Sequence, residues 1–235
     1  MRAVWRTDIG RVRSTNQDAF LAQGGQYPLY AVADGMGGHL GGDIASAMAI
    51  EGLKDCLRDQ RPDEALISRC VSRISRQIYD RQLKETSLQG MGTTLTLLWE
   101  DEQQVYLGHV GDSRAYLLRE GMLHQLSHDH SLVSELLRSG VIDEAAAGDY
   151  PYRNVITRAV GTEEEILCDT AVIDKLPGDR FLLCSDGLSE YIKREQMQEM
   201  LHKESLELIA DTLLSRALER GGRDNITLIL LEVPR

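Results

Sequence analysis

The chain of 235 residues lacks several features that would place it in a special class. It has only five prolines, aromatic residues make up 5% of it, and no glycine-, serine- or proline-rich tract resembles a linker. No stretch approaches the roughly 18 uncharged apolar residues that cross a membrane, and the first residues lack the apolar core of a signal peptide. We therefore expect a cytoplasmic protein with no membrane span, in which residues 1–235 form a single domain.

Positive charge is also in short supply. There are 37 acidic residues against 26 lysines and arginines, so the formal net charge is −11. This excess disfavours nucleic acid and anionic membranes as partners that bind through long-range attraction. It also poses a problem for any phosphate-bearing ligand, because that ligand has the same sign of charge.

Cysteine is scarce, and its spacing does not indicate a disulfide framework. The chain has four cysteines and no Cys-x-x-Cys pair, and an even number is weak evidence for disulfides in a chain of this length. We expect reduced and mostly buried thiols at Cys56, Cys70, Cys168 and Cys184.

One cysteine has the spacing of a different enzyme class. Cys70 and Arg76 match the Cys-x5-Arg pattern of phosphatases with a cysteine nucleophile, but no glycine lies between them. The same segment places apolar residues from Ile67 to Ile78 on one face at helical spacing. Backbone N–H groups in the middle of a helix already bond its own carbonyls and cannot cradle a phosphate. We therefore interpret Cys70 as a core residue of a helix.

The hydrophobic pattern predicts an α+β fold. The strands come in short hairpin-like groups and the helices in pairs, which favours antiparallel sheets with helices packed outside. The predicted strands are 29–33, 93–99, 104–110, 114–119, 180–184 and 226–233, and the predicted helices are 43–57, a segment around 67–78, 132–138, 195–201 and 205–218.

Four aspartates stand at the ends of predicted strands. Asp34, Asp112 and Asp186 follow apolar runs, whereas Asp224 directly precedes one. A single such aspartate is more often a turn residue, but the recurrence beside glycine or asparagine indicates a shared site. Ligands that are all oxygen favour hard cations such as Mg²⁺ or Mn²⁺, because zinc sites normally include histidine or cysteine. Two such ions would hold a transferring phosphoryl group, so metal-assisted phosphate-ester hydrolysis is the predicted reaction class.

Eight short segments occur in the same order as the motifs of one known family. They are RSTNQD at 13–18, VADGMGGHLGG at 32–42, MGTT at 91–94, VGDSRAY at 110–116, SHDHSLV at 127–133, ITRAVG at 156–161, CSDGL at 184–188 and GGRDNITL at 221–228. Through them the chain resembles the metal-dependent type 2C serine/threonine protein phosphatases, the PPM family, in its bacterial branch. The resemblance spans essentially the whole chain. It implies a four-layer α/β/β/α sandwich of two antiparallel sheets flanked by helix pairs, with two Mn²⁺ or Mg²⁺ ions between the sheets.

The resemblance also implies which residues hold the two ions. Asp34 would bridge both ions, and the carbonyl of Gly35 would help to hold one of them. Asp186 and Asp224 would hold the other. Asp18 would serve both binding and catalysis, at the ions or through their waters.

Two further positions match the family at its substrate and at an additional ion. Asp112 matches the position that, together with Asp186, supports a third and weaker ion in bacterial members. Arg13 matches the arginine that grips the substrate phosphate, for which a guanidinium has a suitable fork of donors. Read without the motif, Arg13 would be an ordinary solvated side chain.

The chain departs from the animal pattern at two positions. Gln17 replaces a glutamate found in many members, which removes one possible indirect carboxylate ligand. Met36 stands where animal members have the histidine proposed as general acid, and the nearby histidine here is His39. His39 is the candidate catalytic proton donor to the leaving group, with metal-bound water or a role within the glycine-rich turn as alternatives.

A histidine cluster precedes residues 131–154, which we expect to border the active site. His124, His128 and His130 suggest a metal site by spacing alone, but the family motif favours a structural role for the last two. Residues 131–154 correspond to a flap that varies among bacterial members. Within it, Tyr150, Tyr152 and Arg153 are candidates either for contact with a protein substrate or for plain packing.

The implied function is hydrolysis of phosphoserine and phosphothreonine in proteins. A metal-bridged hydroxide would attack phosphorus directly, with Arg13 and the ions neutralising the phosphoryl oxygens and no covalent phosphoenzyme. The implied partners are phosphorylated proteins, including a eukaryotic-type Ser/Thr kinase and its substrates, and we expect a monomer. The alternatives are a non-catalytic phosphoprotein-binding module, against which the intact aspartates argue, and a cysteine-dependent phosphatase.

Overall fold

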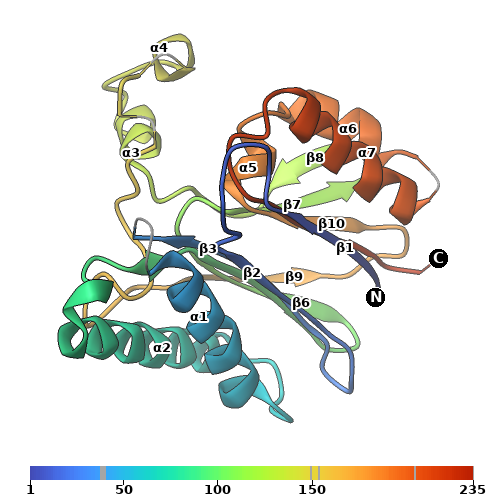
Figure 1. Cartoon of the computed structure of the whole chain (residues 1–235). Helices are drawn as coiled ribbons and strands as arrows, with labels where there is room; N and C mark the ends of the chain where they lie inside the picture. Colours follow the sequence, from blue (N-terminus) through green and yellow to red (C-terminus); the bar gives the residue numbers. More distant parts are fainter. Residues whose placement is uncertain (38–40, 149, 153, 204, 235) are drawn as a thin grey trace.

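Two antiparallel β-sheets lie face to face, and helices cover the outer face of each (Figure 1). The structure is a computed structural model, and it describes residues 1–37, 41–148, 150–152, 154–203 and 205–234. This four-layer α/β/β/α arrangement confirms the predicted fold class. In those ranges no helix is both long and apolar enough to cross a membrane.

Each sheet combines strands from distant parts of the chain. The first sheet pairs the beginning of the chain with its end, because β1 lies antiparallel to β11. In order, this sheet contains β1 (Arg2–Asp8), β11 (Ile226–Glu232), β10 (Arg180–Cys184), β7 (Arg114–Arg119) and β8 (Met122–Gln125). The second sheet contains β2 (Asp18–Gln23), β3 (Leu29–Met36), β5 (Leu95–Glu100), β6 (Gln104–Val110) and β9 (Asp169–Asp174), with β4 (Gly92–Thr93) paired to the end of β3.

Helix pairs complete the outer layers. On the second sheet, α1 (Gly42–Leu57) and α2 (Glu64–Lys84) pack side by side, and the Asp63 carboxylate caps α2 by accepting the Leu66 N–H. On the first sheet lie α5 (Asp186–Ser189), α6 (Arg194–Leu201) and α7 (Leu206–Glu219). The 3₁₀ helix η2 (Thr86–Leu88) follows α2, and α3 (Leu132–Arg138) and α4 (Glu144–Gly148) stand apart from the sandwich in Figure 1.

The apolar run of β11 shows how the layers form. Leu228 and Leu230 pack against α7 and its neighbours, whereas Ile229 and Leu231 face the second sheet. Both faces of this strand are therefore covered, which is why its sequence is continuously hydrophobic rather than alternating. Between the sheets lies a core that includes Tyr30, Val32, Leu98, Leu117, Phe181 and Leu183.

The structure adds strands that the hydrophobic pattern did not predict. Among these are β1, β2 and β9, which lie at the edges of the two sheets. An edge strand exposes much of its surface, and in β1 only Val4 is buried, so the hydrophobic signal is weak.

The prediction of reduced, mostly buried cysteines is confirmed in part. All four are free thiols, and Cys70 lies on the buried face of α2, which confirms the helix-core interpretation. Cys56 and Cys168 are half-buried rather than buried.

Candidate metal centre

Two aspartates of the second sheet occupy the open end of the gap between the sheets. Asp18 opens β2, and its Cα lies directly opposite that of Asp34 in β3, so both side chains share one face. Side chains alternate along a strand, and Asp34 therefore continues the face of Tyr30 and Val32, which lines the inter-sheet core. The sequence predicted that Asp34 directly follows the strand, but in the structure Asp34 lies within β3.

The first sheet holds Asp18 in place from across the gap. The Ser185 hydroxyl donates to Asp18 Oδ2 at 2.8 Å, and the Thr227 N–H donates to the same Ser185 Oγ at 3.0 Å. Asp186 follows Ser185 directly and is the first residue of α5. A single short chain of hydrogen bonds thus connects the ends of β2, β10 and β11.

Asn225 connects the end of the chain to the segment that carries Arg13. Its Oδ1 accepts the Gln17 N–H at 2.8 Å, and its Nδ2 donates to the carbonyls of Ile9 and Thr15, each at 3.0 Å. Residues 9–17 are therefore fastened at three points to the turn before β11. Sequence reasoning did not single out Asn225, although it lies inside the GGRDNITL segment.

Arg13 and Asp224 form an ion pair at the edge of this region. Arg13 Nη2 donates to Asp224 Oδ2 at 2.7 Å, and 49% of the arginine side chain is exposed to solvent. Hydrogen bonding to Asp224 raises the pKa of Arg13, so this guanidinium remains charged. Its remaining N–H groups are available to an anion at the centre.

Two glycines permit backbone segments to meet at the centre. A Cβ on Gly35 would lie 2.0 Å from the Gly42 carbonyl oxygen, and a Cβ on Gly187 would lie 2.0 Å from the Asn225 carbonyl oxygen. Only glycine fits either position, since real Cβ atoms do not approach other atoms that closely. The Gly35 N–H also donates to the Gln17 carbonyl at 3.1 Å.

Asp112 reaches the centre from a turn after β6. Gly111 adopts a φ of +109° there, and its N–H donates to His130 Nδ1 at 3.0 Å. His130 Nε2 lies 3.1 Å from Asp169 Oδ2, so the histidine connects this turn to the start of β9. The Ser113 and Thr94 hydroxyls share a 2.7 Å hydrogen bond beside it.

Burial makes these carboxylates reluctant to ionise. It raises the pKa of Asp18 and of Asp112 to about 7 and that of Asp186 to about 6, and the neighbouring carboxylates add to each shift. The pKa of Asp34 is raised well above its usual value, first by burial and then by the charge of Asp18. The cluster therefore lacks positive charge that would stabilise its ionised form.

Unpartnered oxygen atoms point to what would supply that charge. Asp18 Oδ1, Asp112 Oδ1 and Asp186 Oδ1 are buried and have no hydrogen-bond partner among the residues that the structure describes. Within the described ranges, no three His, Cys, Asp or Glu side chains are placed to hold one ion between them. An ion here would take few carboxylates at a time and keep several waters, which is typical of Mg²⁺ and similar hard cations. The residues present therefore fit divalent ions.

Comparison with known proteins identifies the family. A family model described as protein phosphatase 2C matches residues 10–227. The chain belongs to the protein phosphatase 2C family. The serine/threonine phosphatase stp of Listeria monocytogenes is 40% identical over 241 residues, which cover 99% of this chain and 96% of that protein.

Solved structures of relatives share the fold. The Mycobacterium tuberculosis phosphatase PstP/Ppp superposes with a TM-score of 0.92 at 36% identity, covering 100% of this chain and 99% of that one. The catalytic domain of PstP, determined with two manganese ions, has a TM-score of 0.90 at 35% identity, covering 100% of this chain and 98% of that one. The predicted metal-dependent serine/threonine phosphatase identity and the α+β sandwich are thus confirmed.

The remaining predicted residues of this 2C-type phosphatase have different outcomes. His39 and Arg153 lie outside the described residues. His124 lies on β8. Of the two histidines for which we expected a structural role, His130 is buried beside Asp169 and Arg158, whereas His128 is exposed and lines a pocket together with Asp112 and Asp186.

The flap residues that face the metal centre are not its two tyrosines. A pocket of about 550 Å³ separates Asp112 and Asp186 from the flap. Tyr150 and Tyr152 contact each other edge to face, with ring centroids 6.2 Å apart, and neither lines this pocket. The flap residues that do line it are uncharged and non-aromatic, which gave no signal in the sequence: Ser131, Val133, Ser134, Leu137, Ala147, Gly148 and Asn154.

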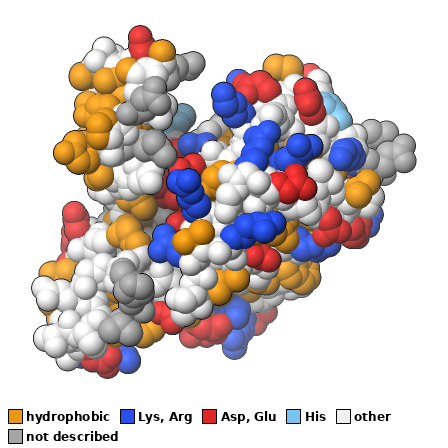
Figure 2. All heavy atoms as spheres, turned by 45° about the horizontal axis from the view of Figure 1, so that its top comes forward, with side chains coloured by type: hydrophobic (Ala, Val, Ile, Leu, Met, Phe, Trp, Pro, Cys, Tyr) orange, Lys and Arg blue, Asp and Glu red, His pale blue; other side chains and the backbone are white. Residues whose placement is uncertain are grey.

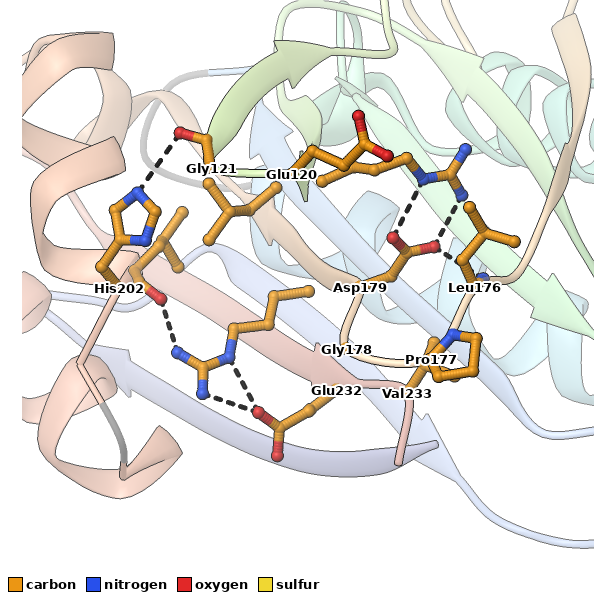
Figure 3. Close-up of a pocket in the computed structure, with 13 residues that line it drawn as sticks. Glu120, Gly121, Leu176, Pro177, Gly178, Asp179, His202, Glu232 and Val233 are labelled. Carbon is orange, nitrogen blue, oxygen red and sulfur yellow. Dashed lines mark hydrogen bonds and ion pairs between the residues drawn. The ribbon is translucent and has the colours of Figure 1, made fainter. Parts of the chain in front are cut away.

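A second hollow, of about 840 Å³, lies at the opposite end of the strands (Figure 3). Two of its carboxylates are paired with arginines of the chain. Asp179 accepts two hydrogen bonds from Arg119, at 2.9 and 2.6 Å, and Glu232 accepts one from Arg180 Nε at 2.8 Å. It therefore has little of the uncompensated charge that marks the metal centre.

The raised carboxylate pKa values predict how pH affects the metal-free phosphatase. An aspartate titrates near 3.9 in an unfolded chain, whereas Asp18, Asp112 and Asp186 titrate near 6 to 7 when folded. Between these values the folded state binds more protons, so the free energy of unfolding should fall as pH rises from about 4 to about 7. Divalent ions favour the ionised carboxylates, so they should reverse this loss.

Melting temperatures measured from pH 5 to pH 8, with chelator and with Mn²⁺, test this expectation. The difference between the two curves should widen as pH rises, and it should widen less in Asp186→Asn. A difference that is independent of pH would contradict the assignment.

Proposed function

We propose that this 2C-type phosphatase removes phosphate from phosphoserine and phosphothreonine in proteins when Mn²⁺ or Mg²⁺ is bound. The observation that carries the proposal is the cluster of half-buried carboxylates between the two sheets, three of which have a buried oxygen with no hydrogen-bond partner among the described residues. Divalent ions bound there would lower the pKa of water and neutralise charge on the transferring phosphoryl group.

The chain's own residues would hold the ions in the way that the family resemblance implies. We assign Asp34, the Gly35 carbonyl, Asp186 and Asp224 to the two ions. Asp18 is fixed by the Ser185 hydroxyl through Oδ2, which leaves Oδ1 directed at the centre. The buried surroundings strengthen each of these electrostatic contacts relative to water.

Arg13 would bind and orient the substrate phosphate. Asp224 fixes the guanidinium through one nitrogen, and the exposed half of the side chain leaves other N–H donors toward solvent. A planar guanidinium can donate two parallel hydrogen bonds to phosphate oxygens. Arg13 would thereby hold the phosphoryl group beside the carboxylate cluster.

Several finer predictions remain predictions. They are the general-acid role of His39, a cytoplasmic and monomeric state, a single catalytic domain over residues 1–235 with its flap at 131–154, and a eukaryotic-type kinase with its substrates as partners. We propose these partners because the curated relatives are named serine/threonine phosphatases.

Replacement of Asp34 tests the proposed reaction. Hydrolysis of a phosphothreonine peptide should require Mn²⁺ or Mg²⁺, and Asp34→Asn should lower kcat/KM at least about a hundredfold because it removes a buried charge at the centre. Asp80→Asn is the matched control, since Asp80 is exposed on α2, and it should retain wild-type turnover.

Two outcomes separate the alternatives. Full turnover in chelator would contradict the metal requirement, and phosphopeptide binding without any turnover in Mn²⁺ would support the non-catalytic module. Cys70→Ser should retain activity, because burial raises the pKa of this thiol and disfavours its thiolate. Loss of activity in that folded variant would instead favour a cysteine nucleophile.

We also propose a third, weaker ion at Asp112 and Asp186. Both residues have a buried, unpartnered Oδ1 and line the pocket beneath the flap. Asp112→Asn should raise the Mn²⁺ concentration for half-maximal turnover several-fold without abolishing turnover. A Mn²⁺ titration of peptide hydrolysis measures this shift, and an unchanged midpoint would contradict the third ion.

Replacement of Arg13 tests its proposed contact with phosphate. Arg13→Ala removes a charge-assisted hydrogen bond to the substrate, so kcat/KM should fall about 10- to 100-fold. Arg13→Lys should recover only part of the loss, because an ammonium cannot form the paired contact. Steady-state kinetics in saturating Mn²⁺ measure both variants, and wild-type kinetics in Arg13→Ala would refute the role.

A further inference from the structure

Three arginines beside Arg13 form a group that the reaction does not use. Arg11, Arg220 and Arg223, here called the arginine rim, belong to two segments that run side by side. The Arg11 N–H donates to the Gly222 carbonyl at 2.7 Å, and Asn225 Nδ2 donates to the Ile9 carbonyl. Because Asp224 follows Arg223 and pairs with Arg13, the rim adjoins the metal centre.

The arginine rim keeps its positive charge. Arg11 Nε donates to the Leu218 carbonyl at 2.8 Å, and Arg220 Nη1 donates to the Tyr191 carbonyl at 2.6 Å and to Gln196 Oε1 at 2.7 Å. These acceptors are neutral, so they orient the guanidinium groups without cancelling their charge. Arg223 has no side-chain hydrogen bond or ion pair within the part of the chain that the structure describes.

Many other arginines of this acidic chain do have carboxylate partners. Examples are the pairs Arg2–Glu207, Arg6–Asp211, Arg114–Asp129, Arg119–Asp179 and Arg180–Glu232. All three rim side chains are exposed. Figure 2 shows several Lys and Arg side chains, with acidic side chains among them, over the half of the molecule with α5, α6 and α7, beside a hollow in which further acidic side chains are visible.

We propose that the arginine rim binds an anionic side chain of the substrate protein, located two to four residues from the phosphoresidue. The inference rests on the proposed phosphatase function and names its preferred substrate class, acidic phosphopeptides. An extended peptide advances about 3.3 Å per residue, so such a side chain would lie about 7 to 13 Å from the phosphate that Arg13 holds. The anion is either a carboxylate or a second phosphate, since a guanidinium binds both in the same geometry.

The arginine rim opposes the effect that the negative net charge of the protein has on acidic peptides. A chain with a net charge of −11 repels an acidic peptide at long range. Close to the centre, the three guanidinium groups replace this repulsion with attraction. The rim would therefore contribute selectivity among phosphopeptides more than general affinity.

Matched phosphothreonine peptides test the proposal. One peptide has neutral flanks, two have acidic residues on the N- or C-terminal side, and one has a second phosphoserine three residues away. For the wild-type protein in saturating Mn²⁺, kcat/KM should be about tenfold higher for at least one anionic peptide than for the neutral one. This ratio should fall toward one as salt rises from 0.05 to 0.5 M.

Variants of the rim assign the effect to these residues. Arg223→Ala and Arg11→Ala should each lower the ratio to about fivefold. Their combination should lower it further, and adding Arg220→Ala should remove it, whereas Arg223→Lys should retain more of the ratio than Arg223→Ala. Arg69→Ala is the matched control, because Arg69 is exposed on α2 and should leave the ratio at its wild-type value. The ratio compares two substrates with one sample, so a partly unfolded variant does not distort it.

The outcomes distinguish this inference from the proposed function. Equal rates on neutral and anionic peptides, or a wild-type ratio in the Arg11→Ala/Arg223→Ala variant, would overturn the rim and leave the phosphatase function standing. Failure of the wild-type protein to hydrolyse any of the peptides in Mn²⁺ would overturn both. The N-terminal, C-terminal and phosphoserine arms show which anion the rim accepts.

Discussion

The crowding of carboxylates into a largely desolvated site is the constraint on which the rest of this structure depends. Burial raises the pKa of Asp18, Asp34, Asp112 and Asp186, and the charges of neighbouring carboxylates raise each of them further. Such a cluster persists only if the surrounding backbone cannot move apart. The packed core between the sheets, the glycine contacts at Gly35 and Gly187 and the hydrogen bonds of Asn225 provide that rigidity.

Carboxylates are paired with arginines at one end of the sandwich, whereas most of those at the other end are not. At the end that holds Arg119 and Arg180, each guanidinium faces its own carboxylate, and the pairs need nothing from outside the chain. At the other end Asp18, Asp112 and Asp186 have no ion pair in the described part of the chain, and Arg13 pairs with Asp224. Strands of the same sheets therefore stabilise the fold at one end and keep charge uncompensated at the other.

The sequence predicted the parts whose physics is local. Strands covered on both faces, such as β3, β10 and β11, have continuous apolar runs, and the strand-end aspartates were visible beside them. The edge strands β1 and β9 were missed because an exposed edge needs few apolar residues. The sequence did not predict that the Asn225 side chain hydrogen-bonds to the backbone of residues 9–17. These residues are about 210 positions away, and only the fold brings them together. The family motifs, in contrast, located the carboxylates without that knowledge.

The pairing of β1 with β11, and of Asn225 with residues 9–17, has a consequence for the synthesis of this protein. Asn225 is translated about 210 residues after the segment 9–17 that it holds. Arg13 and Asp18 therefore cannot take their places before the chain has been synthesised through Asn225. A nascent or truncated chain that stops short of Asn225 would contain both residues without the arrangement in which they act.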